Sequence, residues 1–486
     1  MPAALRPPPS LARKITLGLI LAGGLAFAFY RIGGPSLWLD ETFTWWFSQL
    51  PLRQMLEAAR MDGANPPLYY WMSSIMAGVL GQSEAGLRAP SAIAHGIAIV
   101  GVYLLGRQLG GSTAGLTAAA LWALHPMAIW YAREARPYAL AAALSAFAAW
   151  QFMRARANPS HSNLAAAWSF LAAGLLTHYF FLLLIGSFMA LALLEIRSRP
   201  GFFRCWAGVT LLALLPVSLW VIWFFAQDQP TLAIEWIETP SLADLPATVW
   251  NLLSGYGGQT ASATAALGVV TGALLVGMLT MAPDRGRNQL LGLAMLVLPL
   301  TAVWSVSYLR PVYVDRYFLV ILPEAVALVG CGVLALSRAL ESRSPLRGPW
   351  AMVLLVVLAG SWAAWRVHVN LVYAKEDWRS LARVVAPQGN FDGPIWRDGA
   401  NLLLPLAYYL GPEVPVLDSP SAADCRDGCW FVTRKPYTAT HAFGSAVQEP
   451  DRPWTASAPA GCQERGGWRS ETGIAALWIM CVAWNE

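Results

Sequence analysis

The sequence predicts a polytopic α-helical membrane protein with a small α/β domain at its C-terminal end. Of its 486 residues, 56% are hydrophobic and only 13% are charged, about half the charged fraction of a soluble domain. Apolar runs long enough to cross a bilayer, about 17–25 residues, recur from Ile15 to His368. After about Tyr373 the composition changes to that of a small soluble domain.

The predicted transmembrane part, residues 1–368, contains about eleven spans. Their lengths and their Leu, Ala and Val content suit helices and not the strands of a membrane barrel. The first is expected to be a retained helix, because no signal-peptide pattern with a cleavage site stands at the start. The expected ranges are 13–32, 89–107, 112–131, 138–153, 163–178, 179–195, 205–226, 262–282, 289–308, 317–337 and 350–368.

Basic residues in alternate short loops predict the orientation. The basic loops and the N-terminus are expected in the cytoplasm, and the long segments 33–88 and 227–261 and the tail outside, in the inner membrane of a bacterium. The net charge of +5 is spread over the loops and gives no indication of a nucleic-acid partner. Three outer loops nevertheless carry cations, which an anionic ligand would explain: Arg88, the pair Arg133 and Arg136, and the pair Arg310 and Arg316.

Residues 369–486 are predicted to form the α/β domain on the outside. Ile474 to Trp484 is apolar enough for a short span, but its β-branched and aromatic residues and the lack of a basic flank favour a buried final strand. The other expected elements are helices at Glu376–Ala386 and Asn401–Leu410 and strands at Gly393–Asp398, Val414–Asp418 and Cys429–Lys435.

Four cysteines fall in this tail. In an oxidising compartment they predict two disulfides, whose pairing the sequence leaves open. A zinc site is not favoured, because Cys-x3-Cys followed by widely spaced cysteines matches no standard ligand pattern. The four are Cys425, Cys429, Cys462 and Cys481.

Two adjacent carboxylates, Asp40 and Glu41, stand shortly after the first span among tryptophans. Acidic groups are costly near a bilayer and so point to function. In one interpretation, Asp40 caps an interfacial helix that runs on to Gln49. In the other, Asp40 is a general base for an acceptor hydroxyl or amine, and Glu41 assists it. We expect segment 33–88 to form helices along the membrane interface, with Asp40 facing a cavity.

Further short motifs follow the acidic pair in order. They are Pro66-Pro67-Leu68-Tyr69-Tyr70, Arg88-Ala89-Pro90-Ser91, Tyr103 to Arg107, His125-Pro126, Tyr131 to Tyr138, Thr177-His178-Tyr179, Arg316-Tyr317 with Pro323, and Lys375 to Arg379. Together they resemble the membrane-embedded GT-C glycosyltransferases, most closely the family-39-like branch of protein O-mannosyltransferases and aminoarabinose transferases. The resemblance is strong over about the first 200 residues and loose beyond them.

This resemblance implies transfer of a sugar from a polyprenyl-phosphate donor to a lipid, glycan or protein acceptor on the outer membrane face. Asp40 matches the catalytic acidic residue of the family, and Glu41 its neighbour. Members often carry a basic residue or His before Pro-Pro, where this chain has Asn65, so a contact made there must come from elsewhere or be absent. The residues expected to bind substrate are Asn65, Tyr70, Tyr138 and His178.

Arginines are the expected ligands of the donor phosphate, because a guanidinium grips it with two donors and stabilises the charge of the leaving group. Arg133 and Arg136 are the first candidates, with the alternative that they mark a helix end and pair with Glu134. Arg316 is the second candidate and Arg88 the third. We expect Asp40, Glu41, Arg133, Arg136 and Arg316 to converge on one outward-facing cavity.

Other functions are less consistent with the sequence. No Gly-rich phosphate loop, dinucleotide fingerprint or metal motif is present, which argues against a nucleotide-sugar donor. No cofactor is predicted, and the sequence leaves dependence on a divalent metal open. A transporter or flippase for a lipid-linked solute is the main alternative, although the spans look unbroken and polar residues gather at one end. A non-catalytic assembly or sensor protein is the third.

Overall fold

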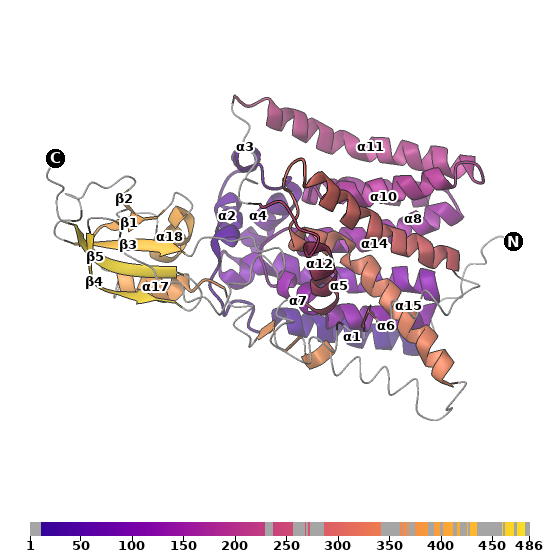
Figure 1. Ribbon diagram of the computed structural model, residues 1–486, viewed down its shortest axis with the longest axis horizontal. Coiled ribbons are helices and arrows are strands. Elements are labelled where there is room, and N and C mark those ends of the chain that lie inside the picture. The colour runs from indigo at the N-terminus through magenta and orange to yellow at the C-terminus, as the bar shows by residue number, and fades with distance from the viewer. Residues whose placement is uncertain are drawn as a thin grey trace.

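The computed structural model of the protein describes residues 11–228, 237–255, 268, 271–272, 286–341, 360–362, 364–365, 367–368, 375–386, 393–398, 402–411, 416–417, 425, 428–434, 459, 462–470 and 474–481. A bundle of helices forms the larger part, and a β-sheet lies beyond one end of it (Figure 1).

Most helices that correspond to predicted spans agree with the expected ranges within about five residues, and α12 was not predicted. The described helices are α1 (Leu11–Phe29), α2 (Leu39–Ser48), α3 (Leu52–Asp62), α4 (Leu68–Leu80), α5 (Glu84–Gly110), α6 (Ser112–Ala123), α7 (Pro126–Ala132), α8 (Tyr138–Ala157), α9 (His161–Thr177), α10 (Phe181–Leu194), α11 (Pro200–Phe225), α12 (Asp244–Ser254), α14 (Gly286–Val306), the 3-10 helix η2 (Asp315–Ile321), α15 (Leu322–Glu341), α17 (Trp378–Val385) and α18 (Leu403–Leu410).

Within the described residues, four helical segments are long and apolar enough to cross a membrane. They are Leu11–Phe29, Glu84–Gly110, Pro200–Phe225 and Asp315–Ser337. The predicted total of about eleven spans stays a prediction, because 262–282 and much of 350–368 lie outside the described residues.

The expected continuous span 112–131 is wrong. The chain forms two helices there, α6 and α7, separated at Leu124 and His125. Pro126 opens α7, and His125 before it has extended backbone angles of φ −73° and ψ 124°. Proline disfavours the helical conformation in the residue that precedes it and lacks an N–H for the helix ladder. The predicted spans are therefore not all unbroken.

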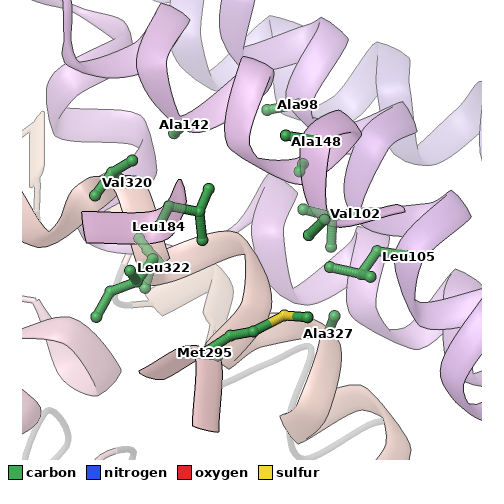
Figure 2. Close-up of a cluster of buried hydrophobic side chains, with 14 of the residues drawn as sticks. Ala98, Val102, Leu105, Ala142, Ala148, Leu184, Met295, Val320, Leu322 and Ala327 are labelled. Atoms are coloured by element: carbon green, nitrogen blue, oxygen red, sulfur yellow. The ribbon is translucent and has the colours of Figure 1, made fainter. Parts of the chain in front are cut away.

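The core of the bundle includes apolar side chains of α5, α8, α10, α14, α15 and η2 (Figure 2). Small residues let the helices approach closely. A Cβ added at Gly106 of α5 would lie 3.1 Å from Ala118 Cβ of α6, and one at Gly330 of α15 would lie 2.8 Å from the same atom. Packing of this kind is typical of helices in membranes, where small residues bring backbones together.

The segment 33–88 forms helices α2, α3 and α4 and the start of α5, as predicted. The first three lie at the end of the bundle nearest the sheet (Figure 1). Phe47 of α2 meets Tyr70 of α4 with ring centroids 4.6 Å apart. Gly63 ends α3 in the left-handed conformation, φ 65°, which glycine adopts without strain. This turn brings the chain back toward α2, and the position of these helices along a membrane interface stays a prediction.

The C-terminal sheet contains five described strands in the order β2-β1-β3-β5-β4. β1 pairs in parallel with β2 and β3, whereas β5 pairs antiparallel with β3 and β4. Buried Trp378 and Leu406 of the two tail helices pack with Ile395 and Val432 of the sheet. The strands are β1 (Ile395–Arg397), β2 (Val416–Leu417), β3 (Cys429–Arg434), β4 (Cys462–Arg469) and β5 (Ile474–Cys481).

The predicted helices and strands of the tail are present, including the final strand, whose residues 474–477 are buried. Strand β4 was not predicted. Its residues include Gln463, Glu464 and two glycines, so the alternation of apolar and polar residues typical of a half-buried strand is missing. The strand lies at the edge of the sheet, exposed and interrupted by a bulge at Glu464, where polar residues are tolerated.

The cysteines of the tail are oxidised in part as predicted. Cys425 and Cys429 form a disulfide. Cys462 is also disulfide-bonded, and it lies opposite Cys481 in the pairing of β4 with β5. Cys205, outside the tail, is a free and exposed cysteine.

The predicted outside position of the tail can be tested with these cysteines. In a variant in which Cys205 and Cys331 are replaced by serine, a membrane-impermeant maleimide should label intact cells or spheroplasts only after reduction, because the tail thiols are then exposed on the outer side. The measurement is gel-shift labelling with and without reductant. Labelling of Cys425 in inverted vesicles alone would overturn the orientation.

Candidate active site

Asp40 lies in the first turn of α2 and is half-buried. Trp38 occupies the cap position of this helix, and its backbone N–H donates to Glu41 Oε2 at 3.2 Å. The alternative in which Asp40 caps the helix therefore does not agree with the structure. The Asp40 side chain is left available for another function.

Glu41 and Arg88 form a buried ion pair. Arg88 Nε and Nη2 each donate to a carboxylate oxygen of Glu41 at 2.7 Å. Its other N–H groups donate to the carbonyls of Ile32 and Pro35 at 2.8 Å and of Ser36 at 2.7 Å. An arginine has five N–H donors, and all five are used here. Arg88 thus fastens the chain just before α2, and this arrangement leaves it no donor for a phosphate.

Glu41 is also the acceptor of further hydrogen bonds. The backbone N–H of Ala135 donates to it at 2.8 Å, and Lys375 Nζ lies 3.0 Å away. Burial alone would raise its pKa, but the charges of Arg88 and Lys375 outweigh burial and lower the pKa from 4.5 to about 2. Glu41 therefore stays ionised and is a poor acceptor for a proton, so its position suits anchoring and not acid–base chemistry.

Breaking this pair is expected to destabilise the protein. Glu41→Gln and Arg88→Met each leave the partner buried without its counter-charge, which typically costs about 3–5 kcal/mol. The midpoint of thermal unfolding in detergent should fall clearly for both variants. Arg53→Met is the matched control, because Arg53 pairs with Glu57 on the exposed side of α3 and such pairs contribute less than about 1 kcal/mol. Equal midpoints for all three variants would contradict an anchoring role.

Arg136, in the loop between α7 and α8, lies beside Asp40. Its Nη1 donates to the backbone carbonyl of Asp40 at 3.1 Å and approaches Tyr70 Oη at 3.5 Å. Asn65 Nδ2 donates to the same tyrosine hydroxyl at 3.3 Å. Arg136 Nε is buried and has no hydrogen-bond partner among the described residues. The structure therefore gathers Asp40, Asn65, Tyr70 and Arg136 in one cluster.

Aromatic side chains extend this cluster toward η2. The ring centroids of Tyr138 and His178 lie 5.6 Å apart, and that of Tyr317 lies 5.2 Å from His178. The guanidinium carbon Cζ of Arg316 lies 5.9 Å from the ring centroid of Trp38, the residue just before α2. Tyr138 is within electrostatic range of Arg136, Arg316 and Asp40. Three of the five residues expected to converge, Asp40, Arg136 and Arg316, therefore occupy one region.

Arg133 points elsewhere. Its Nη1 contacts the ring of His368, and its Nη2 donates to the carbonyl of Arg31 at 3.3 Å. Burial and the nearby charges of Arg88 and Arg31 lower its pKa to about 10. In the alternative left by the sequence, Arg133 and Arg136 pair with Glu134. In the structure, Arg133 instead contacts His368 and the Arg31 carbonyl, and Arg136 contacts the Asp40 carbonyl and Tyr70.

Sequence reasoning missed two acidic groups near Asp40. Asp62 ends α3, and its burial, together with the charge of Asp40, raises its pKa to about 6, although Arg136 and the Ala64 N–H oppose the rise. Glu134 is 2% exposed, and burial, with the charges of Glu41 and Asp40, raises its pKa to about 7. The signal in the sequence was their position, since Asp62 lies three residues before Asn65 and Glu134 lies between Arg133 and Arg136.

Lys375 is the third charged group near Asp40 that was not predicted from the sequence. It opens the tail, yet its ammonium lies among Glu41, Glu134 and the carbonyl of Arg133. The short motif from Lys375 to Arg379 carried the only signal in the sequence. Among the residues that the structure describes, no group of three His, Cys, Asp or Glu side chains could hold a metal ion.

The chain is similar to known proteins in part of its sequence and in its fold. Residues 64–223 match the family described as dolichyl-phosphate-mannose-protein mannosyltransferase. ArnT from Cupriavidus metallidurans bound to undecaprenyl phosphate is similar in structure, with a TM-score of 0.62 and 12% identity over 96% of this chain and 98% of that one. The apo form of the same protein gives a TM-score of 0.60 and 13% identity over 87% and 93%.

A third solved structure is the archaeal oligosaccharyltransferase AglB from Archaeoglobus fulgidus in complex with an inhibitory peptide and a dolichol-phosphate. It gives a TM-score of 0.50 and 13% identity over 87% of this chain and 69% of that one. No curated protein sequence matches this chain. The resemblance predicted from the sequence is thus confirmed at the level of the fold, which the chain shares with ArnT, and four of its described helical segments are long and apolar enough to cross a membrane.

Proposed function

We propose that this protein transfers a sugar from a polyprenyl-phosphate donor to an acceptor on the outer face of the membrane, with Asp40 as the general base. The observation that carries the proposal is the contact of Asp40 with Arg136. A half-buried carboxylate next to a buried guanidinium with an unsatisfied N–H combines a proton acceptor with a site for a phosphate. The related structures with bound undecaprenyl phosphate and dolichol-phosphate support a lipid-linked donor.

The location of the cluster fits such a donor. A polyprenyl tail is held in the bilayer by about 0.8 kcal/mol per buried methylene, so the donor arrives laterally with its phosphate at the level of the headgroups. Helices α2 and α4, which carry Asp40 and Tyr70, lie at one end of the bundle, next to the sheet (Figure 1). Together with the basic alternate loops, this favours a cytoplasmic N-terminus, an outward-facing site and a soluble domain at 369–486.

In the reaction, the acceptor hydroxyl or amine attacks the anomeric carbon as the bond from that carbon to the phosphate oxygen breaks. The proton of the acceptor goes to Asp40, and polyprenyl phosphate leaves. Attack opposite the leaving group inverts the anomeric configuration. The leaving phosphate gains one negative charge, and fixed cations that face it stabilise this change.

The geometry favours Arg136 and Arg316 as the ligands of the phosphate, because both lie in the region of Asp40. Arg133 would act from a greater distance, and Arg88 is fully engaged with Glu41 and backbone carbonyls. Asn65, Tyr70, Tyr138 and His178 provide polar and aromatic groups suited to a sugar, whose ring faces stack on aromatic side chains.

The test is release of polyprenyl phosphate by purified protein supplied with a panel of polyprenyl-phosphate sugars. Slow hydrolysis of one donor, even without an acceptor, would identify the sugar. Absence of release from every donor, combined with movement of a lipid-linked sugar across proteoliposome membranes, would favour the alternative of a flippase. A flippase should also tolerate Asp40→Asn, whereas a base-dependent transferase should not.

A further inference from the structure

The beginning of the tail is bound to the residues that lead into α2. The carboxylate of Glu376 accepts a hydrogen bond from the backbone N–H of Leu39 at 3.1 Å and another from Trp378 Nε1 at 2.8 Å. Arg379 Nη1 donates to the carbonyl of Gly34 at 2.9 Å. The N-terminus of α2 is therefore completed by groups from the far end of the chain.

Lys375, directly before these residues, contacts two separate segments. Its Nζ lies 3.0 Å from Glu41 Oε2 of α2. The same atom lies 3.6 Å from Glu134 Oε1 and donates to the carbonyl of Arg133 at 3.2 Å, both in the α7–α8 loop. The ammonium also lies 5.4 Å from the ring centroid of Trp130. Its side chain is only 5% exposed, so these contacts replace its hydration.

The two segments joined by Lys375 are those that carry the candidate base and the candidate phosphate ligand. Asp40 precedes Glu41 in the first turn of α2, and Arg136 follows Glu134 by two residues. Glu41 accepts the N–H of Ala135, so the loop and the helix already meet at one hydrogen bond. Lys375 adds a charged contact on each side of that hydrogen bond.

We propose that Lys375 is a positioning residue that sets the separation between Asp40 and Arg136 by bridging α2 and the α7–α8 loop. This inference rests on the proposed function, because it assigns roles to those two residues. The tail is then a part of the active site and not an appended module. A reacting pair misplaced by about 1 Å can lose about 10²-fold in rate, and a buried ammonium between two carboxyls is a rigid way to prevent such a shift.

The experiment compares Lys375→Met with wild type in the full-length protein, by release of polyprenyl phosphate from a polyprenyl-phosphate sugar. Turnover should fall about 10²-fold. The KM for the donor should change by less than about threefold, because the ammonium of Lys375 is occupied by Glu41, Glu134 and the Arg133 carbonyl and so acts through the protein and not on the donor. The acidic limb of the pH–rate profile should also move to higher pH. The charged groups that face Lys375 are Glu41, Glu134 and Arg88, and its Nζ also donates to the backbone carbonyl of Arg133. Without the ammonium the two carboxyls take up protons more easily.

Two variants separate positioning from simple loss of structure. Lys375→Arg keeps the charge and should leave the acidic limb in place, even where the larger side chain lowers turnover. Arg379→Met is the matched control, because it loosens the docking of the same tail segment through Gly34 and Glu84 without removing the charge beside Glu41. It should leave the acidic limb unchanged.

Wild-type turnover in Lys375→Met would overturn the inference. The inference would also be wrong if Lys375→Met and Arg379→Met lost turnover equally and neither variant moved the acidic limb of the pH–rate profile. Asp40→Asn, measured in parallel, keeps the two claims apart. If Asp40→Asn is active, the proposed base is wrong, whereas an inactive Asp40→Asn with a fully active Lys375→Met removes only the role of Lys375.

Discussion

Asp40→Asn is expected to lower turnover about 10²–10⁴-fold, with little loss of donor binding. Asparagine keeps the shape of the side chain and removes its ability to accept a proton. The hydrogen bond from Arg136 is made to the backbone carbonyl of Asp40, so it survives the substitution. Rate constants for single turnover and a donor-binding measurement on the same preparation give the two quantities separately.

Glu57→Gln is the matched control for this prediction, because Glu57 lies in the same loop region, on α3, but is exposed and pairs only with Arg53 among the described residues. It should turn over at the wild-type rate. Near-wild-type turnover of Asp40→Asn would defeat the assignment of the base. In that case Asp62 and Glu134, the two neighbouring carboxyls with raised pKa, become the groups to test.

Arg136→Ala is the second substitution with a large expected effect. It should weaken donor binding and also slow bond cleavage, because the phosphate gains charge in the transition state. A loss of about 10²–10³-fold in turnover is the scale for one lost charge-stabilising donor. The measurements are the turnover rate and the donor affinity of the purified variant, each compared with wild type.

Two arginines serve as comparisons. Arg133→Ala should cause a smaller loss, because the guanidinium of Arg133 contacts His368 and the carbonyl of Arg31. Arg53→Ala removes an exposed cation of the same loop region and should have no effect. If Arg133→Ala lowers turnover more than Arg136→Ala does, the phosphate binds beside Arg133, nearer α1, and its assignment to Arg136 is wrong.

Much of the fold could be predicted because its signals are local. Apolar runs located the described spans within a few residues, and β-branched content identified the final strand. The break at His125 was also encoded, by Pro126, but a proline near the middle of an apolar run is often tolerated in membranes. Strand β4 gave no signal, because an exposed edge strand does not need the apolar alternation of a buried one.

The candidate site was predictable only in part. Asp40 and Arg136 stood out because acidic and basic groups are costly near a bilayer. The partners of a charge, in contrast, depend on packing between distant segments. Glu41 is adjacent to Asp40 in sequence, yet it is neutralised by Arg88, 47 residues away, and by Lys375. No local pattern distinguishes a carboxylate that reacts from one that is anchored, and three-dimensional contacts decide between them.

The binding of the tail to α2 has a consequence for the order of biosynthesis. Leu39 and Glu376 are separated by 337 positions, and at about 5–20 residues per second a ribosome needs roughly 20–70 s to cover them. During that interval Glu41 and Arg88 are both already synthesised, so α2 can be anchored on one side. Lys375 and Glu376 arrive last. The first spans of a nascent chain are therefore synthesised long before the N-terminus of α2 can be completed, because its contact with Glu376 forms only after the tail has been made.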